Sequence, residues 1–427
     1  QLSNLDENDP AYEKEQLKLF EAKEALSHYI KTIEKKYPQY YQYKYADAVP
    51  GLAVLQKYIA HTRQSFVHYF ISDTAIYILA VTPSSSKFIK QNRKDFNAGL
   101  FQFLEICADI RGLNNNYENF ALNAYDLYQT LFKPLALPKG RVIICSDAIV
   151  IPFEALTTSV TGNDFLINNY QFSYVYSALF LLRNFNNPPG KNNFLGIAPV
   201  SYAPYLSLPT LKHSGIALDE SSAYFSRSSV LTNGKANRTN LLKHLPDYTI
   251  VAILSHARAD STDKEPLLFM ADSVVKLSEL QQLRNPSAEL IILSACQTNV
   301  GKIAAGEGIF SLARGFASVG IPSITGTLWK ADEESIYDVT KKFLENISKG
   351  MRKDDALQKA KLSFLQNGSN KNFLPYYWAN MILIGNGEPV TLNKPDNKIW
   401  WLTATVSLAV IALIIFIVKK RIKTTSE

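Results

Sequence analysis

Cysteine is scarce in this sequence, with Cys107, Cys145 and Cys296 as the only three among 427 residues. Three cysteines cannot build a disulfide framework, and none of them forms the C-x-x-C pair that is typical of a zinc site. Such low cysteine use is typical of the cytosol and is also compatible with the periplasm. The sequence therefore excludes a small disulfide-stabilised fold, and we expect neither a structural metal nor a bound cofactor.

Concentrated charge is lacking as well. The net charge of +7 is small for this length, the lysines are scattered, and no arginine-rich stripe is present. Because nucleic-acid-binding domains gather positive charge on one face, we expect no nucleic-acid partner. Hydrophobic residues make up 47% of the chain, which suffices for a sizeable core in one large α/β domain or in two or three smaller ones.

One segment carries no charge over 20 positions, "IWWLTATVSLAVIALIIFIV", Ile399 to Val418. Its length matches a helix that crosses a bilayer core of roughly 30 Å. Trp400 and Trp401 stand at one end, where aromatic residues favour the headgroup region, and the basic segment "KKRIK" follows the other end. The sequence thus predicts a transmembrane helix at 399–418, between a polar linker at 389–398 and a basic tail at 419–427.

The orientation of this predicted helix follows from the basic tail, which the positive-inside rule places in the cytoplasm. The preceding residues would then lie in a bacterial periplasm, which requires a signal peptide. None is visible, and the chain starts at Gln1 rather than Met. We therefore expect a single-pass membrane protein, with a tail-anchored protein that faces the cytosol as the alternative.

The N-terminal part is expected to be helical and then β-rich. Residues 11–36 have the apolar spacing of an amphipathic helix, whose apolar face would pack on something upstream. In residues 64–81, two β-rich runs flank Ser72-Asp73-Thr74, which predicts a hairpin. Residues 92–133 have a helical pattern.

From Arg141 onward, apolar β-rich runs alternate with helical patterns. The predicted strands cover 141–145, 193–200, 248–255, 288–295, 321–329 and 376–385, and the predicted helices cover 213–224, 236–243, 306–317, 332–348 and 352–366. Such alternation is typical of βαβ units. Strands that are apolar throughout are buried on both faces, as in a parallel sheet. We therefore predict an α/β fold with a mostly parallel sheet flanked by helices.

Two reactive side chains follow the ends of predicted strands. "VAILSHARAD" presents His256 and "LIILSACQTNVG" presents Cys296. Ligands of open α/β sheets bind beyond the carboxyl ends of the strands, so parallel strands would bring this histidine and this cysteine to one edge. An imidazole beside a thiol is the arrangement of nucleophilic thiol chemistry, in which a thiolate attacks a carbonyl.

Each residue also has a purely structural interpretation. A free cysteine often only fills space in a core, and we expect this of Cys107 and Cys145, which lie inside a predicted helix and a predicted strand. The other histidines have no cysteine at a matching strand end, and no spacing supports a metal site made of two histidines and a cysteine. The pairing of His256 with Cys296 favours the chemical interpretation.

The segment from "AELIILSACQTNVG" to "DDALQKAK" closely resembles a CHAT domain, the caspase-like, separase-related peptidase domain often found after TPR repeats. The matching pieces are "SDAIVIPFEAL", "VAILSHA", "LSACQT", "GEGIFSLARGF", "GTLWKADEES", "DDALQKAK" and "YYWANMILIG". They stand in family order over roughly residues 60–388. The caspase signature Q-A-C-[RQG]-G, with histidine about 50 residues upstream, fits less well.

The resemblance implies that Cys296 is the nucleophile and His256 the base, in a dyad that needs no third member. It also implies an oxyanion hole made of the backbone N–H groups of Cys296 and Ala257. Related peptidases often have glycine after the histidine, and alanine restricts φ there while keeping its N–H. The "PDG" that is common after the first strand is reduced here to Ser146-Asp147-Ala148.

Four more residues are candidates for the substrate pocket. Trp329 and Asp332 follow a predicted strand, where loops face the same edge. Asp147 follows the first strand of the domain, and in a specificity pocket it would favour a basic P1 residue. The preferred interpretation of Glu307 is structural, because an acidic residue near a helix N-terminus interacts favourably with the helix dipole. The alternative is that Glu307 forms part of the pocket wall.

The function expected from these features is that of a membrane-anchored cysteine endopeptidase acting on a protein substrate. Residues 61–388 form the CHAT domain, and residues 1–60 are the end of an upstream helical-repeat region, of TPR type, that binds partners and regulates the peptidase. The alternative is a caspase-like scaffold without activity that assembles proteins at a membrane. A metal-dependent or acyl-transfer hydrolase lacks the ligand and serine-elbow motifs that it needs.

Overall fold

The computed structural model describes residues 51–393 apart from 73, 93–95, 147–149, 184, 186, 259–264, 284–285, 295–306, 331 and 367–372, together with scattered residues between 18 and 35. For residues 96–98 and 307–311 it describes the backbone alone. The chain divides into two compact units, residues 1–391 and 392–427. The finer division of the first unit at residue 60 stays a prediction.

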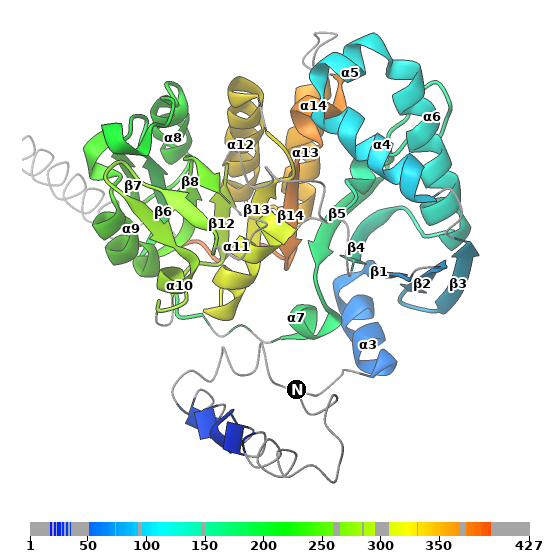
Figure 1. Ribbon diagram of the computed structural model, residues 1–427, viewed down its shortest axis with the longest axis horizontal. Helices are drawn as coiled ribbons and strands as arrows, with labels where there is room; N and C mark the ends of the chain where they lie inside the picture. The colour runs from blue at the N-terminus through cyan, green and yellow to red at the C-terminus, as the bar shows by residue number, and fades with distance from the viewer. Residues whose placement is uncertain are drawn as a thin grey trace, which may run out of the picture. The chain divides into compact units, whose positions relative to one another are not determined.

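The described strands form one large sheet in the order β3-β2-β1-β4-β5-β14-β13-β12-β8-β6-β7 (Figure 1). A second, small sheet has the order β11-β10-β9. The strands are β1 (Gln64–Ile71), β2 (Ala75–Val81), β3 (Ser86–Asn92), β4 (Gly140–Ser146), β5 (Tyr170–Val175), β6 (Asn192–Ala198), β7 (Ser228–Thr232), β8 (Tyr248–Ile253), β9 (Ala257–Arg258), β10 (Leu267–Phe269), β11 (Val274–Lys276), β12 (Leu290–Leu293), β13 (Ser323–Thr327) and β14 (Met381–Gly385).

The large sheet has two halves that run in opposite directions. Strands β7, β6, β8, β12 and β13 are parallel to one another. Strand β14 is antiparallel to β13 but parallel to β5, which continues in parallel through β4 to β1. The predicted α/β sheet, mostly parallel, is therefore confirmed. The carboxyl ends of β8 and β12 lie at one edge of the sheet, and that of β4 lies at the opposite edge.

Helices flank the sheet, and the predictions for 213–224, 236–243, 306–317, 332–348 and 352–366 are confirmed. The helices are α3 (Leu52–Thr62), α4 (Phe96–Ala108), α5 (Ile110–Asn115), α6 (Tyr117–Leu127), α7 (Ala178–Leu182), α8 (Ser214–Ser222), α9 (Arg238–His244), α10 (Leu277–Leu280), α11 (Glu307–Ser318), α12 (Glu333–Ser348), α13 (Lys353–Gln366) and α14 (Pro375–Trp378). Figure 1 shows α4, α5 and α6 together beside the half with β4 and β5, and α8, α9 and α10 around β6 to β8. Helices α12 and α13 pack against each other.

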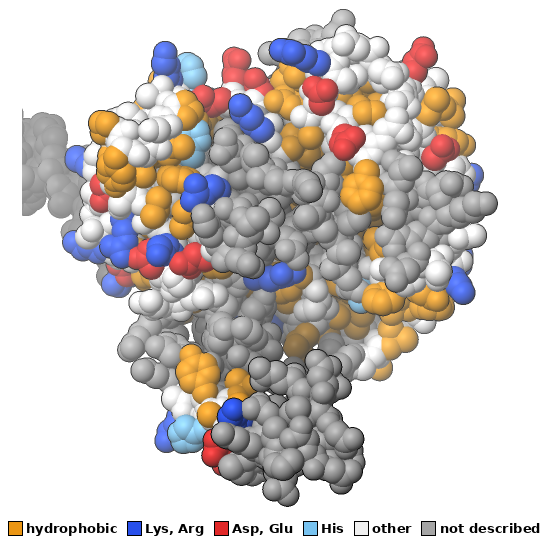
Figure 2. All heavy atoms as spheres, in the orientation of Figure 1, with side chains coloured by type: hydrophobic (Ala, Val, Ile, Leu, Met, Phe, Trp, Pro, Cys, Tyr) orange, Lys and Arg blue, Asp and Glu red, His pale blue; other side chains and the backbone are white. Residues whose placement is uncertain are grey.

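The core strands explain why their sequences are apolar throughout. Every residue of β8, β12, β13 and β14 is buried, as expected for strands covered on both faces. By contrast, β3 lies at the end of the sheet and is largely exposed. On the described surface seen in Figure 2, lysine and arginine side chains are interspersed with acidic and apolar ones rather than joined in one basic patch.

The predicted transmembrane helix is not among the helices that the structure shows. No helix in the described part of the chain is both long and apolar enough to cross a membrane, and residues 399–418 lie outside that part. The expectation of a single-pass membrane protein, in either orientation, is corrected accordingly.

A buried cluster of charges joins α3, β4, α13 and the segment after β14. Arg141 Nε donates to Asp354 Oδ2 at 2.6 Å, and Arg141 Nη1 donates to the carbonyl of Thr62 at 3.0 Å. Arg141 Nη2 also lies 2.8 Å from Glu388 Oε1. Lys353, the first residue of α13, is 2% exposed. Burial, partly offset by nearby acidic residues, lowers the pKa of its ammonium to about 8.

We expect Lys353→Met to stabilise the protein at neutral pH. The folded state holds the Lys353 proton less tightly than the unfolded chain, so the buried charge costs stability below pH 8, and this cost fades as the pH rises toward 10.5. The difference between those pKa values corresponds to about 3 kcal/mol. Urea unfolding should show a gain of about 1–3 kcal/mol at pH 7 and a smaller gain at pH 10. A gain that is equal at both pH values, or that also follows Lys359→Met at an exposed position of α13, contradicts this account.

Candidate active site

The two strands that lead to His256 and Cys296 are neighbours in the sheet. Strands β8 and β12 pair in parallel, with Leu293 opposite Ile253, and Ser294 N–H extends this pairing by donating to the carbonyl of Ile253 at 3.1 Å. His256 and Cys296 each stand three positions beyond this pair. The prediction that both strands end at one edge is confirmed. Cys296 itself lies outside the described residues, so its contact with His256 stays a prediction.

The His256 side chain is buried, at 6% exposed, and held by a backbone carbonyl. Its Nε2 lies 2.9 Å from the carbonyl oxygen of Pro209. Because a carbonyl oxygen can only accept, Nε2 carries a proton, and in the neutral ring the lone pair is then on Nδ1. His256 therefore keeps a basic nitrogen for a reaction while its other nitrogen fixes the ring. Nothing in the sequence pattern pointed to Pro209, because any residue offers a carbonyl.

Ala257 follows in β9, which pairs antiparallel with β10. Phe269 N–H donates to the carbonyl of His256 at 2.9 Å, so His256 and Phe269 form a hydrogen-bonded pair. In antiparallel strands such pairs alternate with non-hydrogen-bonded ones. The next pair, Ala257 with Leu268, is therefore of the second kind. The N–H of Ala257 is directed away from β10 and is not used by this sheet.

The other two cysteines are both buried, as predicted for core residues. Burial raises the pKa of the Cys107 thiol well above its ordinary value, which keeps it a thiol at neutral pH. Cys145 is a buried residue of β4, in the half of the sheet that runs opposite to β8 and β12. Among the residues with described positions, no three histidine, cysteine, aspartate or glutamate side chains form a metal-binding group.

The sequence profile of the CHAT domain matches residues 123–386, which is more than half of the chain. This match includes β4 to β14 and both predicted catalytic residues. The chain belongs to the CHAT domain family. A comparison with curated proteins found no match.

Solved structures similar to this CHAT protein are distant in sequence. Separase in the Saccharomyces cerevisiae separase–securin complex is 10% identical with a TM-score of 0.48, over 78% of this chain and 31% of separase. Gingipain R (RgpB) of Porphyromonas gingivalis, an Arg-specific cysteine proteinase, is 10% identical with a TM-score of 0.42, over 70% of this chain and 76% of its own. Caspase-1 from Spodoptera frugiperda is 11% identical with a TM-score of 0.31, over 49% and 93%. The chain spans about a third of the separase chain.

Two motifs of the CHAT resemblance meet in the core. Glu154 of "PFEAL" accepts from Lys361 Nζ of "DDALQKAK" at 2.6 Å and from the Tyr174 hydroxyl. All three residues are at most 3% exposed. Burial, partly offset by Glu154, lowers the pKa of Lys361, and burial together with Glu154 raises that of Tyr174. These contacts tie α13 and β5 to the turn at Phe153–Ala155 and have a structural role.

Trp329 and Asp332 follow β13 at the same edge as His256, and the structure gives each a structural contact. Trp329 is 6% exposed, and its indole N–H donates to the carbonyl of Tyr376 at 3.1 Å. Asp332 is the N-cap of α12 and accepts from the N–H and the hydroxyl of Ser335 at 3.1 and 2.8 Å. Contact of either side chain with a substrate stays a prediction.

The structure shows the position of Glu307 in its helix but does not describe Asp147. Glu307 is the first residue of α11, which agrees with an acidic residue at a helix N-terminus. Asp147 lies outside the described residues, but β4 ends at Ser146, at the edge opposite to that of β8 and β12. Contact of Asp147 with a substrate therefore stays a prediction.

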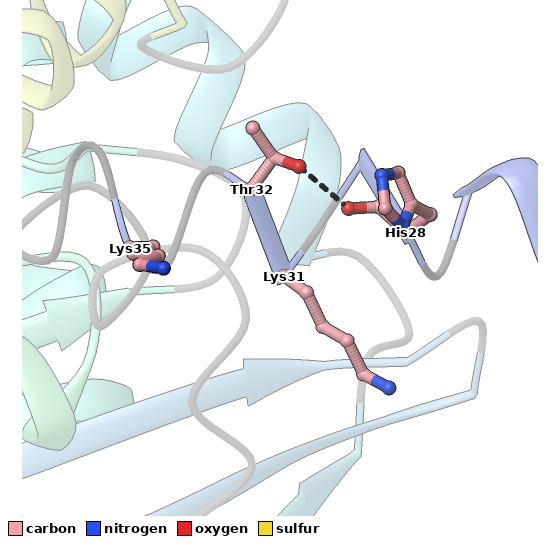
Figure 3. A pocket seen from close by; sticks show the side chains of 4 residues that line it. All are labelled: His28, Lys31, Thr32 and Lys35. Carbon is pink, nitrogen blue, oxygen red and sulfur yellow. Dashed lines mark hydrogen bonds between the residues drawn. The ribbon is translucent and has the colours of Figure 1, made fainter.

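A hollow of about 550 Å³ is lined by four described residues of the N-terminal helical segment, His28, Lys31, Thr32 and Lys35 (Figure 3). They stand three and four positions apart, which places them along one helix face. The Thr32 hydroxyl donates to the carbonyl of His28 at 2.9 Å, within the same helix. This arrangement is an exposed helix surface without converging polar groups, so we assign no binding site to it.

Proposed function

We propose that this CHAT protein is a cysteine peptidase in which Cys296 is the nucleophile and His256 the general base. The observation that carries the proposal is the hydrogen bond from His256 Nε2 to the Pro209 carbonyl. It leaves Nδ1 as the basic nitrogen at the edge where β12 ends. The pairing of Ile253 with Leu293 supports the assignment of Cys296, because His256 and Cys296 each follow this pair by three positions in the sequence. Geometry that supports a nucleophile and a base comes first in such an assignment.

The proposed reaction follows from these groups. His256 Nδ1 takes the thiol proton of Cys296, and the sulfur attacks the carbonyl carbon of a peptide bond. The oxyanion that forms accepts a hydrogen bond from the N–H of Ala257, which the β9–β10 pairing leaves unused. The carbon–nitrogen bond then breaks, and His256 gives its proton to the leaving amine. Water activated by His256 hydrolyses the thioester and restores the thiol.

The substrate of this reaction is proposed to be a protein, and the region before the CHAT domain is proposed to regulate it. The described residues between 18 and 35 are helical and exposed, which supports a helical region ahead of the domain. Exposed apolar side chains such as Leu26 and Tyr29, at 54% and 62% exposed, are available to partners.

The test compares the wild-type chain with Cys296→Ala on a diverse peptide mixture, with new termini read by mass spectrometry. We expect fragments from the wild type that are missing with the variant, and the termini then report the P1 preference. Iodoacetamide labelling gives a second readout that needs no turnover, because a thiolate reacts much faster than the buried thiols Cys107 and Cys145. Cleavage that persists in the variant, or a Cys296 that reacts no faster than the buried thiols, contradicts the proposal.

A further inference from the structure

The backbone of His256 does not follow the regular hydrogen-bonding pattern of the small sheet. A hydrogen-bonded antiparallel pair exchanges two bonds, and one of them is present between Phe269 N–H and the carbonyl of His256. The N–H of His256 donates instead to the hydroxyl of Tyr202 at 3.2 Å. The carbonyl of Phe269, which would normally receive it, accepts from the Ser255 hydroxyl. Tyr202 thus replaces a ladder bond at the residue that carries the imidazole.

The direction of each hydrogen bond in this group is determined. The Ser255 hydroxyl has one proton, which goes to the Phe269 carbonyl. The Tyr202 hydroxyl lies 3.0 Å from Ser255 Oγ, so it donates to that oxygen and accepts from the N–H of His256. Ser255 is completely buried, and without Tyr202 this network would leave buried polar groups without partners, which is costly.

The Tyr202 ring supports the imidazole as well. The two ring centroids are 5.1 Å apart with an interplanar angle of 44°. Tyr202 and Pro209 belong to the same loop between β6 and α8, which Leu211 N–H closes by donating to the carbonyl of Val200 at 2.8 Å. Val200 has a φ of 61°, a strained conformation for a β-branched residue, and such strain persists only where the surroundings enforce it.

We propose that Tyr202 is a positioning residue that holds His256 in the tautomer and orientation needed for catalysis. The hydroxyl orients the backbone of His256, the ring packs on its imidazole, and the same loop supplies the Pro209 carbonyl that binds Nε2. The proposal rests on the proposed peptidase function for its consequence in catalysis, but the tautomer of His256 is a property of the folded chain and is measured without turnover.

The test uses Tyr202→Phe, which keeps the ring and removes the hydroxyl. The matched control is Tyr205→Phe in the same loop, where the exposed Tyr205 bonds the carbonyl of Asp272 rather than His256. Nitrogen-15 NMR of histidine in the full chain with Cys296→Ala reports the tautomer, and a His256→Gln variant identifies the His256 signals among the six histidines. Thermal unfolding confirms that each variant is folded.

We expect one neutral tautomer of His256, protonated on Nε2, in the parent and in Tyr205→Phe, and a mixture of both tautomers in Tyr202→Phe. With an active enzyme, Tyr202→Phe should lower kcat by about 10- to 100-fold with KM within about threefold, as expected for a misplaced catalytic group. An unchanged tautomer in Tyr202→Phe overturns the proposal even if the peptidase is active. An altered tautomer in a chain that cleaves no peptide supports the positioning role and contradicts only the proposed function.

Discussion

His256→Gln is expected to reduce kcat/KM for a cleaved peptide by about 10²- to 10⁴-fold, the range typical of a lost general base. Glutamine can still donate an amide N–H toward the Pro209 carbonyl that now holds Nε2, so the local fold has a replacement for that bond. It has no basic nitrogen at the position of Nδ1. The loss therefore reports proton transfer from Cys296 rather than collapse of the site.

The matched control for this variant is His213→Gln. His213 is exposed and lies just after the loop that carries Tyr202 and Pro209, and its backbone N–H rather than its ring contacts Glu333. We expect its kcat/KM to stay within about twofold of the wild type, as is usual away from a functional contact. Activity of His256→Gln within tenfold of the wild type would exclude His256 as the base.

Lys361→Met is expected to lower the free energy of unfolding by about 3–5 kcal/mol, because it leaves the buried carboxylate of Glu154 without its counter-charge. Lys361 and Glu154 are 1% and 3% exposed, so water cannot replace the lost ammonium. The Tyr174 hydroxyl still donates to Glu154, but one neutral donor does not compensate a buried charge. Urea unfolding at pH 7 measures the loss.

The double variant Glu154→Gln with Lys361→Met distinguishes the effect of the unpaired charge from the effect of changing the side chains at these buried positions. It removes both charges and keeps an amide that Tyr174 can bond, so we expect it to recover most of the stability lost in Lys361→Met. Lys359→Met, at an exposed position two residues earlier in α13, should change stability by less than about 0.5 kcal/mol. A double variant that is less stable than Lys361→Met alone would show that the ion pair is not the source of the loss.

Sequence patterns were sufficient for most of the buried strands of the sheet. The apolar runs at 248–255 and 288–295 contain β8 and β12, because strands buried on both faces have no polar positions to interrupt them. Helices α8, α11, α12 and α13 lie where the helical patterns predict them. Strands β3 and β7, at the two ends of the sheet, were missed because exposed or half-buried residues weaken the apolar signal. Strand β5, in the middle of the sheet, was missed as well, because Gln171 and Ser173 interrupt its apolar run.

By itself, therefore, the sequence determined most of the buried strands, the long helices that follow them, the CHAT family and the two residues proposed for catalysis. Both the apolar runs of buried strands and the spacing of motifs are local features of the sequence. Only the tertiary structure decided the reversal between β13 and β14, which separates the end of β4 from the edge that carries His256. It also decided the partners of His256, since Pro209 and Tyr202 lie 47 and 54 residues away in sequence. A backbone carbonyl and a tyrosine hydroxyl acquire such roles only through long-range packing, which leaves no local pattern.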